Sequence, residues 1–351
     1  MSRSGDPSSA PASAPTQLNQ PQLPKGGGAL RGLNDAFQPQ AFTGTTSLTI
    51  PLPVSPCRGF EPGLALTYDS ASGNGPFGVG FRLAPLQVSR NTDKRIPSYT
   101  EADTFVLSGA GELVRKLRPS QEGREVVRRV ESEGDPAWAI TEYRPRIEQG
   151  FARIEYWAQM ADGEGYWQVT DSHNVVHTFG RAAHARIADP DNPKRVLTWL
   201  LESSIDARGN VVCYDYKSEN DENIPAAGYE PSREQRAQRY LHKVRYGPYE
   251  NPSGRENSWH FELVFDYGER DFSAPEQIAY DPQKPWPVRA DPFSTYRPGF
   301  ELRTQRLCHA ALLYHRFPHL NGGAPQLVRA LRFFYDQTPT MSFLTAIAEV
   351  G

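Results

Sequence analysis

The chain has 351 residues, with 38 Lys and Arg against 41 Asp and Glu, and a formal net charge of −3 at pH 7. This length can bury a large core in one to three domains, and the weak net charge argues against a general electrostatic role in binding nucleic acid. Aromatic residues make up 11% of the chain, and 31 prolines and 29 glycines interrupt it, which together favour strands joined by turns and long connections.

The N-terminal stretch differs in composition from the rest. Residues 1–22 are rich in Ser, Pro, Ala and Gln and almost free of large apolar side chains, so we predict a disordered tail, followed by one β region over residues 23–351. The tail has no apolar stretch typical of a Sec signal, and no apolar run in the chain is long enough for a transmembrane helix. We therefore expect synthesis in the cytoplasm and no membrane span.

The cysteines and histidines predict no metal site. Cys57, Cys213 and Cys308 are widely separated and odd in number, which fits neither a disulfide framework nor a zinc site. His173 and His177 are close in sequence, but residues four apart on a strand lie about 13 Å apart, too far for one metal ion.

A dense glycine block follows two alternating, strand-like runs at 47–54 and 64–70. It contains Gly73, Gly75, Gly78 and Gly80. Glycine permits positive φ and close backbone approach, so we expect this block to be a structural corner that is packed into something else.

The same block formally matches the G-x-G-x-x-G motif of dinucleotide sites at residues 73–78. Such a site needs a helix N-terminus next, whose free N–H groups hold the pyrophosphate. Here the chain runs from Gly78 into another strand-like run, and Pro76 removes one donor. We therefore expect no nucleotide and no other cofactor.

Turn signals divide the later chain into hairpins. YWQVT (166–170) and VVHTF (175–179) flank a turn at 171–174, and counting back from it pairs Val169 with Val176. VLTWLLESSI (196–205) leads through Asp206–Asn210 into the strand-like run 211–216. Further pairs are expected between 241–246 and 260–267, and between 302–314 and 327–335. The fold class predicted is all-β, an extended curved antiparallel sheet built from hairpins with long Pro/Gly-rich connections.

Aromatic residues are concentrated in one segment, 138–167, which includes Trp157, Tyr166 and Trp167. Aromatic rings can stack on sugars, so these three residues form a candidate binding surface. The competing interpretation is that they are the buried side of a sheet.

Several segments closely resemble one protein family. They are LPKGGGALRGL, TGTTSLTIPLPVSP, LTYDSASGNGPFGVGF, RNTDKRIPSY, DPDNPKRVLTWLLESSIDARGNVVCYDY, FELRTQRLCHAALLYHRFP and SFLTAIAEVG. Together they resemble the N-terminal region shared by the Salmonella virulence plasmid B protein (SpvB) and the B components of bacterial Tc toxins. The resemblance covers roughly residues 23 to 351. D-x-x-G-N followed by an aromatic strand is also similar to the rearrangement-hotspot (Rhs) and tyrosine-aspartate repeats, which build curved sheets.

The resemblance implies a structural role in a toxin complex. In Tc toxins the B component and a C-type (Rhs) component form a hollow β shell around a toxic C-terminal domain, and a propeller in B docks on the A-type channel component. The present chain resembles the part of B before the propeller and the Rhs-rich region. We expect it to be extracellular after release as part of such a complex.

The alternative to be excluded is an enzyme such as the plasmid protein of this family. The plasmid protein carries an ADP-ribosyltransferase domain after the shared region, with an arginine, a Ser/Thr-rich strand and a Glu-x-Glu pair. The nearest matches are Thr45–Ser47 in the packing segment and Glu131 with Glu133 in a charged loop. We therefore predict no catalytic residues and a non-catalytic assembly module; the alternative function is a surface or glycan-binding β module of a secreted virulence protein.

Overall fold

The computed structural model describes residues 38–40, 45–83, 85–121, 123–132, 137–148, 150–226, 228, 230–249, 258–274 and 278–350. The chain divides into residues 1–36 and 37–351, and every described residue belongs to the second unit. The tail predicted at residues 1–22 and the predicted boundary at residue 23 therefore lie outside the described residues.

Strands dominate this unit, which confirms the predicted all-β antiparallel fold. The helical elements are short 3₁₀ turns: η2 (Ala183–Ala185), η3 (Glu230–Ser232) and η5 (Asn321–Gly323). Within the described ranges, no helix combines the length and the apolar character needed to cross a bilayer.

Most strands belong to one sheet, whose first part closes on itself. Successive antiparallel pairings lead from β16 through β5, β6, β7, β11, β12 and β13 to β14, and β14 pairs with β16 again. We call these strands the ring. Its members are β5 (Gln87–Arg90), β6 (Phe105–Leu107), β7 (Gly111–Arg115), β11 (Trp138–Pro145), β12 (Arg153–Gln159), β13 (Gly165–Thr170), β14 (Val176–Phe179) and β16 (Asn192–Ile205). The closure of the sheet was not predicted from the sequence.

Aromatic side chains pack together in the core of the ring. The ring centroid of Trp167 lies 4.9 Å from that of Phe105, 4.8 Å from Tyr143 and 5.0 Å from Tyr156. Trp199 on β16 contacts the same group, and its Nε1 donates a 2.8 Å hydrogen bond to the carbonyl of Gly165. Because tilted and edge-on aromatic pairs bury large areas, this cluster stabilises the closure.

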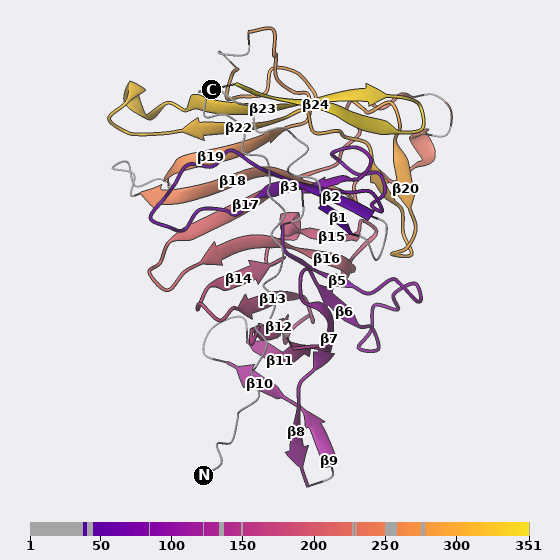
Figure 1. Cartoon of the computed structure of the whole chain (residues 1–351). Coiled ribbons are helices and arrows are strands. Elements are labelled where there is room, and N and C mark those ends of the chain that lie inside the picture. The colour runs from indigo at the N-terminus through magenta and orange to yellow at the C-terminus, as the bar shows by residue number, and fades with distance from the viewer. Residues whose placement is uncertain are drawn as a thin grey trace, which may run out of the picture. The chain divides into compact units, whose positions relative to one another are not determined.

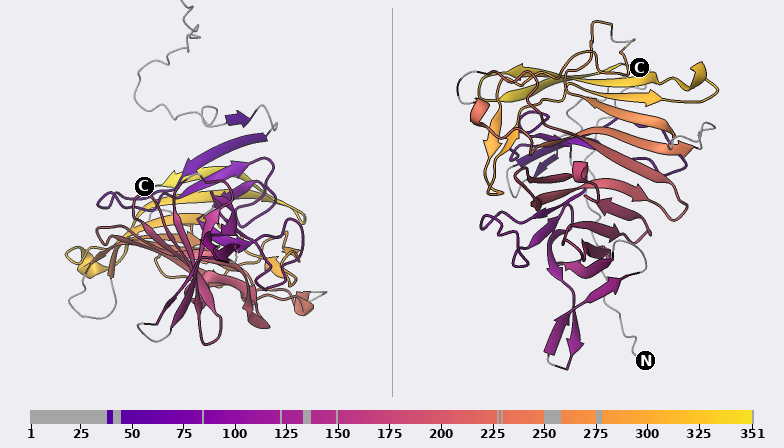
Figure 2. Two further views of the ribbon diagram at one scale, coloured as in Figure 1. Left: turned by 90° about the horizontal axis from the view of Figure 1, so that it is seen from below. Right: turned by 180° about the vertical axis from the view of Figure 1, so that it is seen from behind.

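Beyond β16 the sheet continues as an open, antiparallel extension (Figure 1). Its strands follow one another side by side in the front view (Figure 1) and in the view from behind (Figure 2). They are β17 (Val211–Ser218), β18 (Arg239–Tyr249), β19 (Ser258–Asp266), β22 (Ala310–His315), β23 (Gln326–Gln337) and β24 (Ser342–Val350). This extension is the extended, hairpin-built sheet that the sequence predicted.

A separate four-stranded sheet packs on the open extension. Leu52 and Leu66 belong to the same buried core as residues of β18, and the Tyr246 hydroxyl accepts a 2.8 Å hydrogen bond from the Ser55 amide. This sheet contains β1 (Gln38–Gln40), β2 (Thr45–Pro51), β3 (Ala65–Asp69) and β4 (Phe81–Leu83). The remaining strands are β8 (Leu117–Ser120), β9 (Gly123–Val126), β10 (Arg128–Glu131), β15 (Arg186–Asp189), β20 (Phe293–Thr295) and β21 (Leu302–Thr304).

The hairpins test the predicted turns. The turn at Asp206–Asn210 is correct, since Ile205 pairs with Val211 and the Asp206 amide donates to the Asn210 carbonyl. The register at 171–174 is wrong by one residue, because Val169 pairs with His177 instead of Val176. The Asp171 amide donates to the Val175 carbonyl, so the loop takes one residue more than predicted and Val175 joins no ladder.

Replacing Trp167 with Ala should destabilise the protein by about 3–5 kcal/mol, because it removes one of the two tryptophans of the aromatic cluster and leaves a cavity. Phe151→Ala is the matched control, since Phe151 is 85% exposed and should change stability by less than about 0.5 kcal/mol. Unfolding in urea followed by tryptophan fluorescence measures both. Similar midpoints for the two variants would contradict the assigned core.

Candidate functional site

The three residues of the predicted aromatic surface do not share one environment. Neighbours in a strand point to opposite faces, so Tyr166 and Trp167 diverge. Trp167 is 0% exposed in the core of the ring and offers no ring face to a ligand. Tyr166, 6% exposed, instead packs against Trp138 and Trp157, with centroid distances of 5.2 and 5.9 Å.

Arginines partly cover the aromatic group formed by Trp138, Trp157 and Tyr166. The guanidinium of Arg129 lies 5.7 Å from the Trp157 ring, and that of Arg181 lies 5.5 Å from the Tyr166 ring. Cation–π contact of this kind stabilises both partners. It also occupies ring faces on which a sugar would have to stack.

The glycine block forms a corner that contacts the last strand. Gly78 has φ +83°, and a Cβ there would lie 2.7 Å from the Ser342 carbonyl oxygen. Gly80 has φ +78°, and its Cβ would lie 2.4 Å from the Tyr68 ring. At Gly75 the nearest atom would be at an ordinary 3.6 Å, and at Gly73 nothing lies within 4 Å. The chain continues into β4, so no helix N-terminus follows the G-x-G-x-x-G match.

Polar side chains that the sequence analysis missed hold this corner in place. Asp291 accepts hydrogen bonds from Asn74 (2.7 Å), Arg289 (2.7 Å) and Ser342 (2.5 Å). Arg289 also donates to the Gly75 carbonyl at 2.8 Å. Burial raises the pKa of Asp291, but the hydrogen bonds from Arg289, Ser342 and Asn74 outweigh it, so the pKa lies below its usual range. The available signal was a charged pair, Arg289 and Asp291, inside a proline-rich segment.

One Ser–His–Asp arrangement occurs next to the ring. His177 Nδ1 lies 2.9 Å from Ser204 Oγ, and its Nε2 lies 3.7 Å from an Asp171 carboxylate oxygen. Ser204 is only 5% exposed, and it also hydrogen-bonds the Tyr214 side chain. It lines neither of the two cavities described below, so neither of them brings a substrate to this arrangement.

Burial holds several histidines neutral. Burial, followed by the nearby charges of Lys243, Lys217 and Arg270, lowers the pKa of His242 to about 3. Its Nε2 is buried without a hydrogen-bond partner among the described residues. Burial also lowers the pKa of His177, His309 and His315. The described residues contain no cluster of His, Cys, Asp and Glu that could hold a metal ion.

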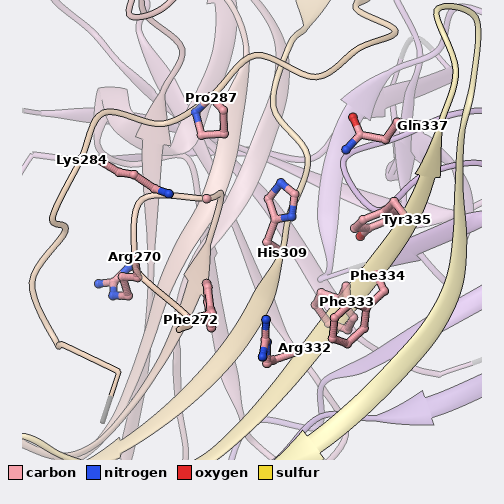
Figure 3. A pocket seen from close by; sticks show the side chains of 11 residues that line it. Arg270, Phe272, Lys284, Pro287, His309, Arg332, Phe333, Phe334, Tyr335 and Gln337 are labelled. Atoms are coloured by element: carbon pink, nitrogen blue, oxygen red, sulfur yellow. The ribbon is translucent and has the colours of Figure 1, made fainter. Parts of the chain in front are cut away.

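A cavity of about 350 Å³ lies between β23 and the loops around residues 268–272 and 284–287 (Figure 3). Cationic and aromatic side chains line it, and its lining contains no carboxylate. The lining residues are Gly268, Arg270, Phe272, Lys284, Pro287, His309, Arg332, Phe333, Phe334, Tyr335 and Gln337. Their separation in the sequence left no signal for this cavity.

A second cavity, of about 620 Å³, lies along residues 219–236 and differs in its charges. Three of its four carboxylates pair with arginines: Glu219 with Arg306 at 2.7 Å, Glu230 with Arg303, and Glu234 with Arg236 at 2.7 Å. Because most of the charge in this cavity is neutralised in place, it attracts a charged ligand less than the first cavity does.

Comparison with known proteins decides the family. Residues 40–317 match the family model described as Salmonella virulence plasmid 65kDa B protein. This chain belongs to that family. The resemblance found in the sequence is therefore confirmed.

The curated relatives of this SpvB-family chain are longer than the chain itself. The proteins named mono(ADP-ribosyl)transferase SpvB from Salmonella choleraesuis (strain SC-B67) and Salmonella enteritidis are each 37% identical over 344 residues, which cover 94% of this chain. The matched region is 56% of each relative, so the chain spans about half their length.

Solved structures share the fold. The N-terminal domain of effector protein SpvB from Salmonella typhimurium strain LT2 has a TM-score of 0.80 at 37% identity, covering 86% of this chain and 98% of that domain. TcdB2 in the TcdB2–TccC3 crystal structure has a TM-score of 0.82 at 35% identity, covering 96% of this chain and 17% of the matched one. The Photorhabdus luminescens Tc holotoxin pore gives 0.81 at 34% identity, covering 96% and 16%.

The glycine corner gives a test by substitution. Gly78→Ala should cost about 1–3 kcal/mol, because the new Cβ meets a backbone oxygen and φ is positive. Gly73→Ala should change stability by less than about 0.5 kcal/mol, because the space around Gly73 is open. Thermal unfolding followed by circular dichroism measures both variants, and equal effects would contradict a packing role for Gly78.

His242 predicts a loss of stability on acidification. In the unfolded chain its imidazole titrates near pH 6.5, and in the folded protein it does so near 3, so the unfolded state binds more protons between these values. Its contribution is complete above about pH 6.5 and declines as the pH falls below that value. Urea unfolding at about pH 7 and about pH 5.5 should show a smaller pH effect in His242→Gln than in the wild type.

His173→Gln is the control for this measurement, because the His173 side chain is 85% exposed. It should leave the pH dependence of stability unchanged. The other buried histidines will leave some pH dependence of stability in His242→Gln. If the stability of His242→Gln depends on pH as steeply as that of the wild type, His242 is not held neutral.

Proposed function

We propose that this chain is a non-catalytic assembly module of a bacterial toxin complex, which contributes a section of an antiparallel β shell that encloses and delivers a toxic C-terminal domain. The observation that carries the proposal is the edge of β24 beyond Ser342, whose carbonyl accepts a hydrogen bond from the Val79 amide. Among the described residues, β24 pairs with β23 alone, while the other end of the sheet is closed in the ring. An open strand edge is a template for a further strand.

The exposed side chains near this edge fit a joining role. Phe343 on β24 is 42% exposed, and Phe334 on the neighbouring β23 is 41% exposed. Ala346 and Ala348 are also exposed, so little charge protects the edge of β24 between Ser342 and Glu349. Natural sheets usually blunt free edges with Lys, Pro or bulges. We infer that a strand from the rest of a B-type shell covers this edge in the assembled complex.

The proposed partners are a C-type (Rhs) component and an A-type channel component. Structures of the similar TcdB2 include complexes with TccC3 and a Tc holotoxin pore, which supports this context. The transferase activity in the names of the Salmonella relatives belongs to proteins about half of which matches this chain. We propose that this chain itself lacks that activity, uses no cofactor, and is extracellular after release with its complex.

Charging the free edge tests the proposal. The isolated chain should self-associate, because its uncovered edge pairs with other copies. Ala346→Lys together with Ala348→Lys should make it monomeric and should abolish its incorporation when co-expressed with the remainder of a B-type shell and a C-type component. Size-exclusion chromatography with light scattering measures the first result, and co-purification measures the second.

Ala161→Lys together with Ala183→Lys is the matched control, because both positions are exposed and lie away from β24. This variant should associate and assemble as the wild type does. Full incorporation of the β24 variant would refute the joining role. Turnover of NAD by the isolated wild-type chain would refute the non-catalytic assignment.

A further inference from the structure

The cavity beside β23 has a lining that the assembly role does not require. Figure 3 shows Lys284, Phe272 and Pro287 on the loop side, Phe334, Tyr335 and Gln337 on the strand side, and His309 between them. Lys284, Pro287, Phe334 and Gln337 are exposed, so the cavity opens to solvent. A volume of about 350 Å³ is within the range of small-molecule sites.

The charges in the cavity are unbalanced. Arg270 is already satisfied, because it pairs with Asp266 at 3.0 Å and donates to the carbonyls of Ala279 and Tyr280. Lys284 and Arg332, in contrast, form no ion pair or hydrogen bond through their side chains among the described residues. The acid that interacts electrostatically with Lys284 is Asp271, whose carboxylate is exposed and accepts hydrogen bonds from Ser273.

Aromatic side chains in the walls of the cavity hold Arg332 in place. The Arg332 guanidinium lies 4.8 Å from the Phe272 ring and 5.1 Å from the Phe334 ring, so aromatic contacts hold it in place while leaving its donors unused. Because the guanidinium is planar and presents several N–H donors, it suits bidentate binding of a carboxylate or phosphate. His309 is half-buried near Lys284 and can donate a further hydrogen bond.

We propose that this cavity binds a small organic anion, with a phosphate or carboxylate head held by Lys284 and Arg332 and an apolar body against Pro287 and the parts of Phe272 and Phe334 that Arg332 leaves open. The site does not use the edge of β24, although Phe334 lines the cavity and also pairs with Ala346 of β24. It discriminates by two features together: the charge of the head and the apolar contact of the body.

Calorimetric titration of the full chain tests the proposal with three probes. Phenyl phosphate should bind with a Kd of about 1 mM or tighter, inorganic phosphate about tenfold more weakly, and benzyl alcohol more weakly still. Lys284→Gln and Arg332→Gln should each weaken phenyl phosphate binding by about tenfold or more, because each removes a charge-assisted hydrogen bond. Arg332→Lys retains the charge and should lose less affinity than Arg332→Gln.

Arg329→Gln is the matched control, because it removes the same charge from the same strand at a residue that pairs with Glu349 and does not line the cavity. It should bind phenyl phosphate as the wild type does. Melting temperatures establish that the variants are folded; Lys284 is exposed, so Lys284→Gln keeps the test decisive even if Arg332→Gln unfolds. No binding of phenyl phosphate, equal loss in Arg329→Gln, or binding of an Asp-rich peptide alone would overturn the proposal.

Discussion

Hydrogen bonding on both edges of β16 is the constraint on which the rest of the fold depends. Ser203–Ile205 pairs with β14 on one edge and with β17 on the other, and Thr198–Leu200 pairs with β5. One 14-residue strand therefore closes the ring and begins the open extension. Because both ladders share the same backbone, a shift in the register of β16 would turn its apolar residues away from both cores at once.

Buried ion pairs in the long connections are a second constraint on the fold. Arg306 pairs with Glu219, and Arg289 pairs with Asp291, each at 2.7 Å and almost without exposure. Trp286 precedes Arg289 in the same connection and is 0% exposed. The Arg306 guanidinium lies 4.4 Å from the centroid of its ring. Buried pairs contribute little net stability, but removing one partner leaves an uncompensated charge. These ion pairs therefore fix the position of the proline-rich connection and contribute little to its net stability.

The sequence predicted what depends on neighbouring residues. The Asp206–Asn210 turn followed from D-x-x-G-N, because the required side-chain and backbone bonds lie within five positions. The shift at His177 arose because Asp171 bonds Val175 through both its backbone amide and its carboxylate, which places Val175 in the loop. The ring closure, the Asp291 network and the cavity join residues far apart in the chain, and no local pattern specifies them. Tyr166 was grouped with Trp167 in the sequence analysis, although alternation along a strand sends them to opposite faces, and which face lies inside depends on the ring.

The contact between the glycine corner and β24 bears on how the chain folds during synthesis. The Val79 amide donates to the Ser342 carbonyl, and the Cys308 amide donates to the Pro76 carbonyl. The corner is made early by the ribosome, whereas its acceptor on β24 emerges hundreds of residues later. The first sheet must therefore wait, with its apolar side uncovered, until the last strands arrive, and such long-range pairing slows folding. The nascent chain is thus most exposed to aggregation before β24 has been synthesised, which makes the rate of elongation and the supply of chaperones determinants of its yield.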